Sequence, residues 1–410
     1  MPSRPTASSA AASSPRGAVL STGRQVALRS HRGAGRTPRA VNTLEHQARL
    51  SLRLTPRDRW LIRMLHEHQV LTSAQITQTA FPSARSATTR LLELYRWRVL
   101  DRFQPFRTVG TAPMHYVLDI AGAGILAAED GLDVKALGYR HERAIGIAHS
   151  LHLAHTVGVN AFFCALIATT RHPGPPGDCP YGPGGGALTA LWSEARCQRL
   201  FGDLVRPDGY ARWREAHNGG IREVEFFLEY DTGSENLTQL IRKLAGYHAL
   251  AAATGIRTPL LIWLPTTRRE TNARQALAAA LASLDRPGLV PVATSAADLT
   301  PHMMTHRFPT VQAEDAVVGG PAGARWLPLG PSPHGSGTHG RVRLAALAEL
   351  WPGSLAHRPP ASPGSNEAPG VHQVGGDGRP PAPDPMPPAP PRVLEQASRS
   401  TARLSANLQH

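Results

Sequence analysis

The chain has 410 residues, with 44 Lys and Arg against 30 Asp and Glu, which gives a formal net charge of +14. Its length exceeds that of one ordinary domain, so we expect more than one folded part. No apolar run approaches the roughly 18 residues of a membrane-spanning helix, so we expect a cytoplasmic protein without a membrane partner. The excess of positive charge favours a polyanionic partner, nucleic acid before membrane.

Both ends of the chain are expected to be disordered. Residues 1–50 form a basic arm with eight Arg and a single acid, Glu45, and without a sustained apolar period. An Arg- and Ser-rich start also resembles a transit peptide, but residues 1–40 lack a convincing amphipathic helix. Residues 331–410 are rich in Pro and are expected to be mostly disordered too.

Residues 51–135 predict a winged helix-turn-helix domain. Caps and helical spacing of apolar residues predict three helices, which begin after Thr55, after Thr72 or Ser73, and at about Ser83. Two strand-like runs follow, Val99–Phe103 and His115–Leu118, joined by a loop that contains Pro and Gly. A further helix from about Ile120 to Glu129 closes this domain.

Candidate DNA contacts gather on the third helix and on the wing. Residues 51–118 hold ten Arg and four acids, and the first turns of a recognition helix enter the major groove. Arg binds guanine edges or phosphates, and Ser and Thr contact either. We predict DNA contacts by Arg85, Ser86, Thr88, Thr89 and Arg90 on the helix, and by Arg102 and Arg107 on the wing. The alternative is a helical protein-interaction domain whose Arg face is merely solvated.

The rest of the chain divides into a helix, a linker and an α/β domain. A long connecting helix is predicted over 136–170, followed by a Pro/Gly linker over 171–187, where the Gly run lacks the ending of a phosphate loop. Strand-like and helical runs alternate over 188–330, which favours an α/β sheet domain. The predicted strands are Glu223–Tyr230, Leu260–Leu264 and Leu289–Thr294, and the predicted helices are Glu235–Ala253 and Glu270–Leu284.

Acidic residues converge in this α/β domain. Strand alternation places Glu225, Phe227, Glu229 and Asp231 on one face. Beside Asp208 on a neighbouring strand, these carboxylates would hold Mg²⁺ through oxygen ligands. The alternative is a solvated rim of acids at a strand end, with a turn at residues 206–209.

The spacing of these acids resembles the core of PD-(D/E)XK nucleases. Pro207-Asp208 and Glu229-Tyr230-Asp231 match the acidic half of that motif, but Asp231 stands where the Lys is expected. Only Lys243 on the following helix would replace it, and Glu194 matches an upstream helical Glu. The resemblance implies Asp208, Glu229, Lys243 and Glu194 as catalytic residues and Asp208, Glu229 and Asp231 as ligands of Mg²⁺.

The arrangement from about residue 50 to 310 resembles the bacterial replication-relaxation family. The resemblance rests on the winged helix followed by Trp192-Ser193-Glu194, Arg206-Pro207-Asp208-Gly209, the 228–233 segment LEYDTG and Lys243-Leu244-x-x-Tyr247. It implies a protein of a plasmid or mobile element, linked to replication and DNA relaxation. Only Lys135 and Lys243 are lysines, and this bias towards Arg is typical of a GC-rich, actinobacterial genome.

Three functions follow from this reading. The first is a DNA-binding protein in replication, relaxation or mobilisation of a plasmid or integrated element, with double-stranded DNA and replication or mobilisation proteins as partners. The second is a Mg²⁺-dependent endonuclease or nickase, and the third is a winged-helix transcriptional regulator. Because the chain has so few lysines, we predict that Lys243 points towards Asp208 and Glu229, where a compact ammonium serves better than a guanidinium.

Two further sets of residues carry weaker signals. His149, His152 and His155 recur at helical spacing, but no third metal ligand is visible by spacing, so packing or solvent exposure is the favoured interpretation. Cys164, Cys179 and Cys197 are odd in number and lack a CxxC spacing, which argues against disulfides and a structural zinc site.

Overall fold

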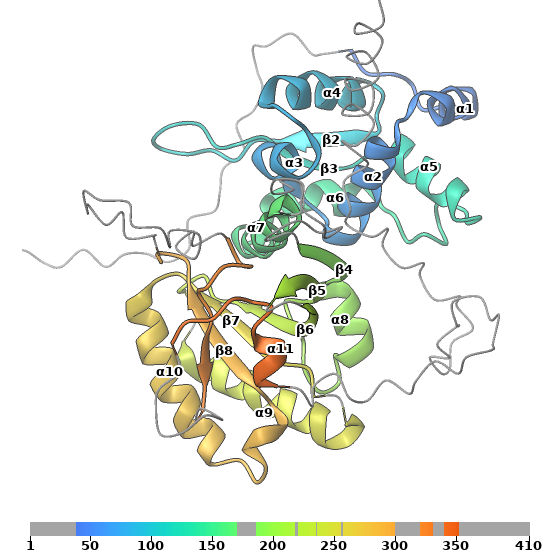
Figure 1. Cartoon of the computed structure of the whole chain (residues 1–410). Coiled ribbons are helices and arrows are strands. Elements are labelled where there is room, and N and C mark those ends of the chain that lie inside the picture. Colours follow the sequence, from blue (N-terminus) through green and yellow to red (C-terminus); the bar gives the residue numbers. More distant parts are fainter. Residues whose placement is uncertain are drawn as a thin grey trace, which may run out of the picture.

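The computed structural model describes residues 38–169, 186–217, 220–234, 236–255, 257–299, 320–330 and 340–351. They form an N-terminal block, residues 38–149, and a C-terminal block, residues 186–351, with helix α7 between them (Figure 1). Most of the predicted basic arm, most of the Pro/Gly linker and most of the C-terminal tail lie outside the described residues.

The N-terminal block contains helices and a small antiparallel sheet, and the predicted elements follow one another as expected, with α1 and β1 in addition. Its helices are α1 (Leu44–Arg53), α2 (Pro56–His68), α3 (Ser73–Ala80), α4 (Ala84–Arg96), α5 (Ile120–Glu129), α6 (His141–Gly146) and the 3₁₀ turn Ile147–His149. The strands β1 (Leu71–Thr72), β2 (Leu100–Phe103) and β3 (His115–Leu118) pair in the order β1-β3-β2. Thr55 and Thr72 cap α2 and α3 with capping boxes, and Ser83 caps α4, so local side-chain bonds fix where these helices begin.

The predicted boundary of the disordered arm at residue 50 is too late. Helix α1 starts at Leu44, Leu50 is only 1% exposed, and the ring of His46 bonds the Trp97 carbonyl at 2.8 Å. Before the helix, Arg39 forms ion pairs with Asp101 and Asp119. The sequence hides this helix because its buried face is narrow, with only His46 and Leu50 buried, while the apolar Leu44 and Leu52 are exposed.

The predicted connecting helix over 136–170 is also corrected. Helix α6 and its 3₁₀ turn end at His149, and α7 (Leu153–Thr169) starts after a break, at an angle of 101° to the first segment. The apolar residues of α7 are spread over all faces of the helix, which is typical of a helix buried between two layers. In the described part of the chain no single helix is long and apolar enough to cross a membrane, and only this bent pair reaches the required length and composition together.

A six-stranded mixed sheet forms the centre of the C-terminal block. Its strands are β4 (Gly186–Ser193), β5 (Gly209–His217), β6 (Gly220–Tyr230), β7 (Leu260–Leu264), β8 (Val292–Ala296) and β9 (Leu327–Leu329), in that spatial order. The first three strands are antiparallel, β6, β7 and β8 are parallel, and β9 is antiparallel to β8. The sequence predicts an α/β sheet with strands that correspond to β6, β7 and β8, but it gives no bounds for β4, β5 or β9.

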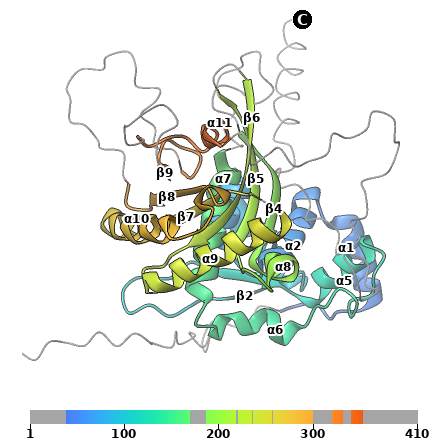
Figure 2. The same cartoon turned by 90° about the horizontal axis from the view of Figure 1, so that it is seen from below.

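Helices cover both faces of this sheet (Figures 1 and 2). One face packs against α8 (Glu194–Phe201), α9 (Leu237–Thr254) and α10 (Thr267–Ala282), which share a core with Phe227 and Ile262. The other face packs against α7 through a cluster of aromatic residues around Phe162. The same cluster continues into the N-terminal block, so the two blocks share one apolar core through α7.

Part of the predicted C-terminal tail is folded. Residues 340–351, with α11 (Leu347–Leu350), pack on the C-terminal block, and the side chains of Leu344 and Leu347 are fully buried. Val342 pairs with Trp326 through two backbone hydrogen bonds, and Arg343 bonds the buried carboxylate of Glu215 at 2.5 Å. The expectation of disorder from residue 331 onwards is therefore wrong for this segment, because Pro and Gly around it mask a short apolar run.

Candidate functional site

Three strands bring the predicted acidic residues to one edge of the sheet. Ser193 at the end of β4 pairs with Gly209 at the start of β5, and Gly209 pairs with Leu228 near the end of β6. The residues next to these positions, Glu194, Asp208 and Glu229, therefore lie at the same edge. Antiparallel pairing is the cause, because it places the start of β5 beside the ends of both its neighbours.

Lys243 joins the two central carboxylates, which confirms the predicted direction of its side chain. Its Nζ lies 3.4 Å from Oδ1 of Asp208 and donates a hydrogen bond to Oε2 of Glu229. The side chains of Asp208 and Glu229 are 6% and 3% exposed, and that of Lys243 is 32% exposed. The ammonium thus enters a buried acidic pair from the solvent side and balances part of its charge.

Tyr247 completes this arrangement one helical turn after Lys243. Its hydroxyl donates to Oε1 of Glu229 at 2.6 Å, so α9 holds both oxygens of that carboxylate. Burial, and next the charge of Asp208, raises the pKa of Glu229 to about 8, although Lys243 and Tyr247 act in the opposite direction. A tyrosine hydroxyl donates or accepts, so the bond survives protonation of Glu229. The sequence motif includes Tyr247, but the place of this residue on the apolar face of its helix predicts only that its ring packs in the core.

His155 is the site residue that the sequence reading missed. Its Nε2 lies 3.3 Å from Oδ1 of Asp208, and its ring packs edge-on against Tyr230. Burial opposes the charge on His155, but its hydrogen bond to Asp208 and the charge of Asp208 raise its pKa. Burial alone would raise the pKa of Asp208. The hydrogen bond from His155, the charge of Lys243 and the Tyr230 N–H together bring that pKa below its usual value. Among the three histidines at helical spacing, only tertiary contact distinguishes His155.

Glu194 and Asp231 do not join this cluster in the same way. Glu194 is exposed at the start of α8, where Ser193 is the N-cap, and it lines a cavity of about 20 Å³ together with Asp208 and His68. Asp231 forms an ion pair with Arg269 of α10 and accepts a hydrogen bond from the Gly233 N–H. Its carboxylate is thus engaged in holding the turn after β6.

The carboxylates of Asp208 and Glu229 suit a cation that has few protein ligands. All four oxygens of Asp208 and Glu229 already accept hydrogen bonds or ion pairs, and Asp231 is paired elsewhere. Magnesium commonly uses one or two carboxylates together with water and substrate phosphates. Asp208 and Glu229 fit that pattern, whereas a site made from three protein carboxylates including Asp231 does not fit.

A second group of metal-ligating residues lies in the N-terminal block. Asp101, Asp119 and His141 place one ligand atom each within 4.8 Å of one another, the one such group in the described residues. Arg39 pairs with both of these Asp side chains, and Arg98 lies 3.4 Å from Asp119. The two guanidinium groups already supply positive charge, so this group is an ionic network that anchors the residues before α1.

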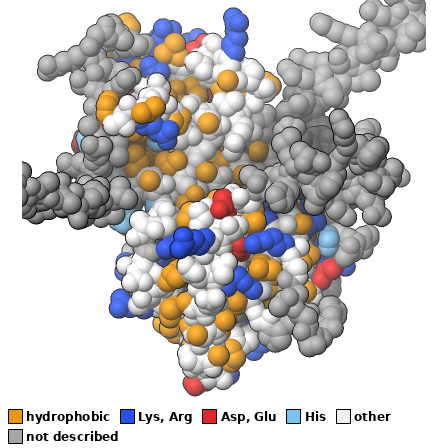
Figure 3. All heavy atoms as spheres, turned by 90° about the vertical axis from the view of Figure 1, so that its left-hand side faces the viewer, with side chains coloured by type: hydrophobic (Ala, Val, Ile, Leu, Met, Phe, Trp, Pro, Cys, Tyr) orange, Lys and Arg blue, Asp and Glu red, His pale blue; other side chains and the backbone are white. Residues whose placement is uncertain are grey.

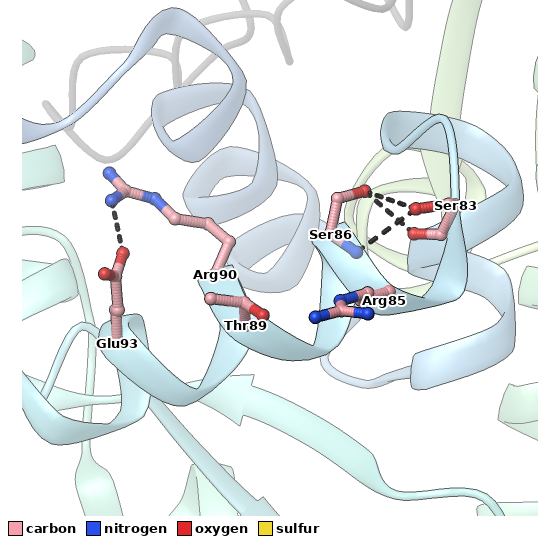
Figure 4. Close-up of a pocket in the computed structure, with 6 residues that line it drawn as sticks. All are labelled: Ser83, Arg85, Ser86, Thr89, Arg90 and Glu93. Carbon is pink, nitrogen blue, oxygen red and sulfur yellow. Dashed lines mark hydrogen bonds and ion pairs between the residues drawn. The ribbon is translucent and has the colours of Figure 1, made fainter.

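The predicted DNA contacts on α4 divide into exposed and engaged side chains. Arg85, Thr88 and Thr89 are exposed, and Ser86 is half-buried beside the cap Ser83. Arg85, Ser86 and Thr89 line a surface hollow of about 440 Å³ together with Ser83, Arg90 and Glu93, whereas Thr88 lies outside it (Figure 4). In this view no marked contact joins Arg85 to the other residues drawn.

Arg90 and Arg102 hold the block together. Arg90 bonds the buried Asp58 at 2.5 Å and Glu93 at 2.8 Å, and Arg102 lies over the ring of Tyr95 at 4.3 Å. Arg107 is exposed on the β2–β3 loop. Among the predicted Arg contacts, Arg85 and Arg107 are thus the most available to a ligand.

The two blocks meet beside the acidic cluster through Glu67 at the end of α2. Its Oε1 accepts from the N–H of Ser193 at 3.1 Å and from the hydroxyl of Ser193 at 2.8 Å, and it pairs with Arg196 of α8. Burial opposes ionisation, but the charges of His68 and Arg196 lower the pKa of Glu67 to about 2. An ionised Glu67 therefore ties the N-terminal block to the helix that carries Glu194.

Comparison with known protein families gives a match over the centre of the chain. Residues 62–261 match the model of the replication-relaxation family. The match begins within α2 and ends within β7, so it covers most of the N-terminal block, without α1, together with α7 and the acidic cluster. It covers just under half of the chain. No curated protein and no solved structure matches the chain significantly.

Proposed function

We propose that this chain is a DNA-binding protein that acts in replication, relaxation or mobilisation of a plasmid or integrated element. The observation that carries the proposal is the family match across α4, the β2–β3 hairpin and the acidic cluster. The order of helices and strands in the N-terminal block supports a winged helix-turn-helix, with α4 as recognition helix. Double-stranded DNA is the proposed partner, and replication or mobilisation proteins are proposed as further partners.

Basic surface supports the same partner. Arg85 and Arg107 are exposed on α4 and on the adjoining loop, and Figure 3 shows basic side chains on one face of both blocks. Contacts between Arg and phosphates release counterions, so affinity for duplex DNA should fall steeply as salt rises. Fluorescence anisotropy with a labelled duplex at several salt concentrations tests this. Binding that is absent, or insensitive to salt, contradicts the proposal.

A Mg²⁺-dependent endonuclease or nickase is the second candidate, because Asp208, Glu229 and Lys243 meet at one sheet edge. Asp208 and Glu229 would hold the ion, which stabilises charge at a scissile phosphate and lowers the pKa of an attacking water. Lys243 would orient the water or the phosphate as a point charge. His155 would hold the Asp208 carboxylate in place.

Incubation of supercoiled plasmid with the full chain, in Mg²⁺ or in EDTA, separates the two candidates. Nicked circles that appear only with Mg²⁺ and disappear in Asp208→Asn support the nuclease. DNA binding without nicking leaves a binding protein, and the transcriptional regulator then remains as the alternative. The buried charged cluster favours an active site over that alternative, because a regulator has no need of it.

A further inference from the structure

The loop between β2 and β3, residues 104–114, presents apolar side chains to solvent at its tip. It projects from the N-terminal block in both Figure 1 and Figure 2. Val109 is 86% exposed and Phe106 is 45% exposed. Burial of a large apolar side chain is favourable, so a bound partner that covers the tip would gain stabilisation that the free chain lacks.

The stem of this loop is held rigidly. The ring of Phe103 stacks on that of His115 at 5.1 Å across the β2–β3 pair, and the side-chain amide of Gln104 donates to the Ala112 carbonyl at 2.7 Å. Phe103 is buried in a cluster with Ile147 and Leu153. The stem therefore fixes the direction in which the tip points, as a side chain that enters a ligand requires.

The tip also carries charge, and the base of the loop adjoins the proposed recognition helix. Arg107 is exposed between Phe106 and Val109, and at the base of the loop Arg102 lies over the ring of Tyr95 on α4. A duplex bound along α4 would therefore lie beside the base of the wing. An exposed cation flanked by apolar side chains suits a phosphate beside a base step.

We propose that Phe106 and Val109 form an apolar wedge that enters between neighbouring base pairs of duplex DNA and unstacks them, while Arg107 binds the adjacent phosphate. The inference rests on the proposed DNA binding and assigns the wing a task beyond contact with the backbone. Apolar wedges of this kind open a base step at a cost that is lowest at flexible pyrimidine–purine steps such as TA. The preferred ligand is therefore a duplex that contains TA steps.

The test uses the full chain and duplexes with 2-aminopurine at a TA step, because stacking quenches this fluorescent base. Anisotropy measures binding and fluorescence intensity measures unstacking in the same samples. Saturation with the wild type should raise the intensity about twofold or more, as unstacking predicts. The double variant Phe106→Ser, Val109→Ser should bind within roughly tenfold of the wild type, a loss of about 1.4 kcal/mol or less, without this rise.

Leu151→Ser is the matched control, because Leu151 is 81% exposed but lies between α6 and α7, outside the wing. It should leave both signals unchanged, and circular dichroism checks that each variant is folded. Wild-type binding without a rise in intensity overturns the wedge and leaves DNA binding intact, which would favour a protein partner for the tip. If the wild type does not bind DNA at all, the proposed function fails first and the wedge fails with it.

Discussion

At the scale of single residues, the scarcity of lysine in the chain suggested a specific role for Lys243, and the structure places this residue against two carboxylates. The chain has 44 basic residues and only two are lysines, and this one contacts both buried carboxylates at the sheet edge. An ammonium approaches two carboxylates as a point charge, whereas a guanidinium requires a planar fork of donors. The side chain is therefore matched to its surroundings in shape as well as in charge.

We predict that Lys243→Arg lowers plasmid nicking by about tenfold or more, the rate equivalent of roughly 1.4 kcal/mol, and leaves DNA affinity unchanged. Lys135→Arg is the control, because Lys135 is exposed and far along the chain from the cluster. Nicked-circle formation and anisotropy provide the two measurements. Equal nicking by both variants would show that Lys243 serves only to balance the buried acids.

Arg85 and Arg90 lie one and a half turns apart on α4 and should respond to substitution in opposite ways. Arg90→Ala should reduce the free energy of unfolding by about 2–3 kcal/mol, because it removes the partner of the buried Asp58. Arg85→Ala should leave stability within about 0.5 kcal/mol and weaken DNA binding by about 1–3 kcal/mol if it reads a base edge. Urea unfolding and anisotropy measure the two effects. A stable Arg90→Ala with weakened binding would return Arg90 to the DNA interface.

At the scale of helices and strands, the sequence predicts those features that local chemistry determines. Caps such as Thr55 and Thr72 determine helix starts, and alternation along β6 separates Phe227 and Glu229 from Leu228. Alternation misleads at Asp231, because the strand ends at Tyr230 and the next carboxylate turns to Arg269. His155 lies on α7, whose apolar surface faces two layers at once, so periodicity cannot select it.

The contact between α2 and α8 depends on an ionised Glu67 and should depend on pH. Because the pKa of Glu67 is lowered to about 2, this carboxylate stabilises the folded chain above about pH 4.5 and loses that effect as the pH falls towards 2. Glu67→Gln should therefore lower the free energy of unfolding by about 2–3 kcal/mol at pH 7. The difference in this free energy between variant and wild type should shrink below pH 4.5.

Denaturant unfolding of both proteins at several pH values measures this difference. Glu45→Gln is the control, since the side chain of Glu45 is 79% exposed and pairs with Arg49 on the surface of α1. A cost of Glu67→Gln that stays constant from pH 7 to pH 3 would mean that the charge of Glu67 contributes little.

At the scale of the whole molecule, the two blocks form one folding unit. Phe162 and Phe163 of α7 belong to a single core that runs from Leu50 in α1 to Leu347 in α11. Changes of composition along the chain locate the two blocks and the connecting helix between them but do not reveal α1 or α11. Nearby Pro, Gly and Arg hide α1 and the segment around α11, although each buries apolar side chains.

The ends of this unit can be located by truncation. A chain of residues 38–351 should unfold in one cooperative transition with a midpoint close to that of the full chain, because it keeps α1, α11 and the shared core. A chain of residues 51–330 loses the buried side chains of Leu50, Leu344 and Leu347. Loss of each such side chain costs about 2–5 kcal/mol when it leaves a cavity.

The shorter chain also leaves the buried Glu215 and Glu270 without Arg343 and Arg341. We therefore expect the free energy of unfolding to drop by at least about 5 kcal/mol, which is roughly the whole stability of a marginal domain. The chain of residues 51–330 should then be partly unfolded at about 25 °C. Circular dichroism during thermal unfolding of the three chains measures this. Equal midpoints for all three would place the ends of the folding unit at residues 51 and 330, and the packing of α1 and α11 would then contribute nothing to its stability.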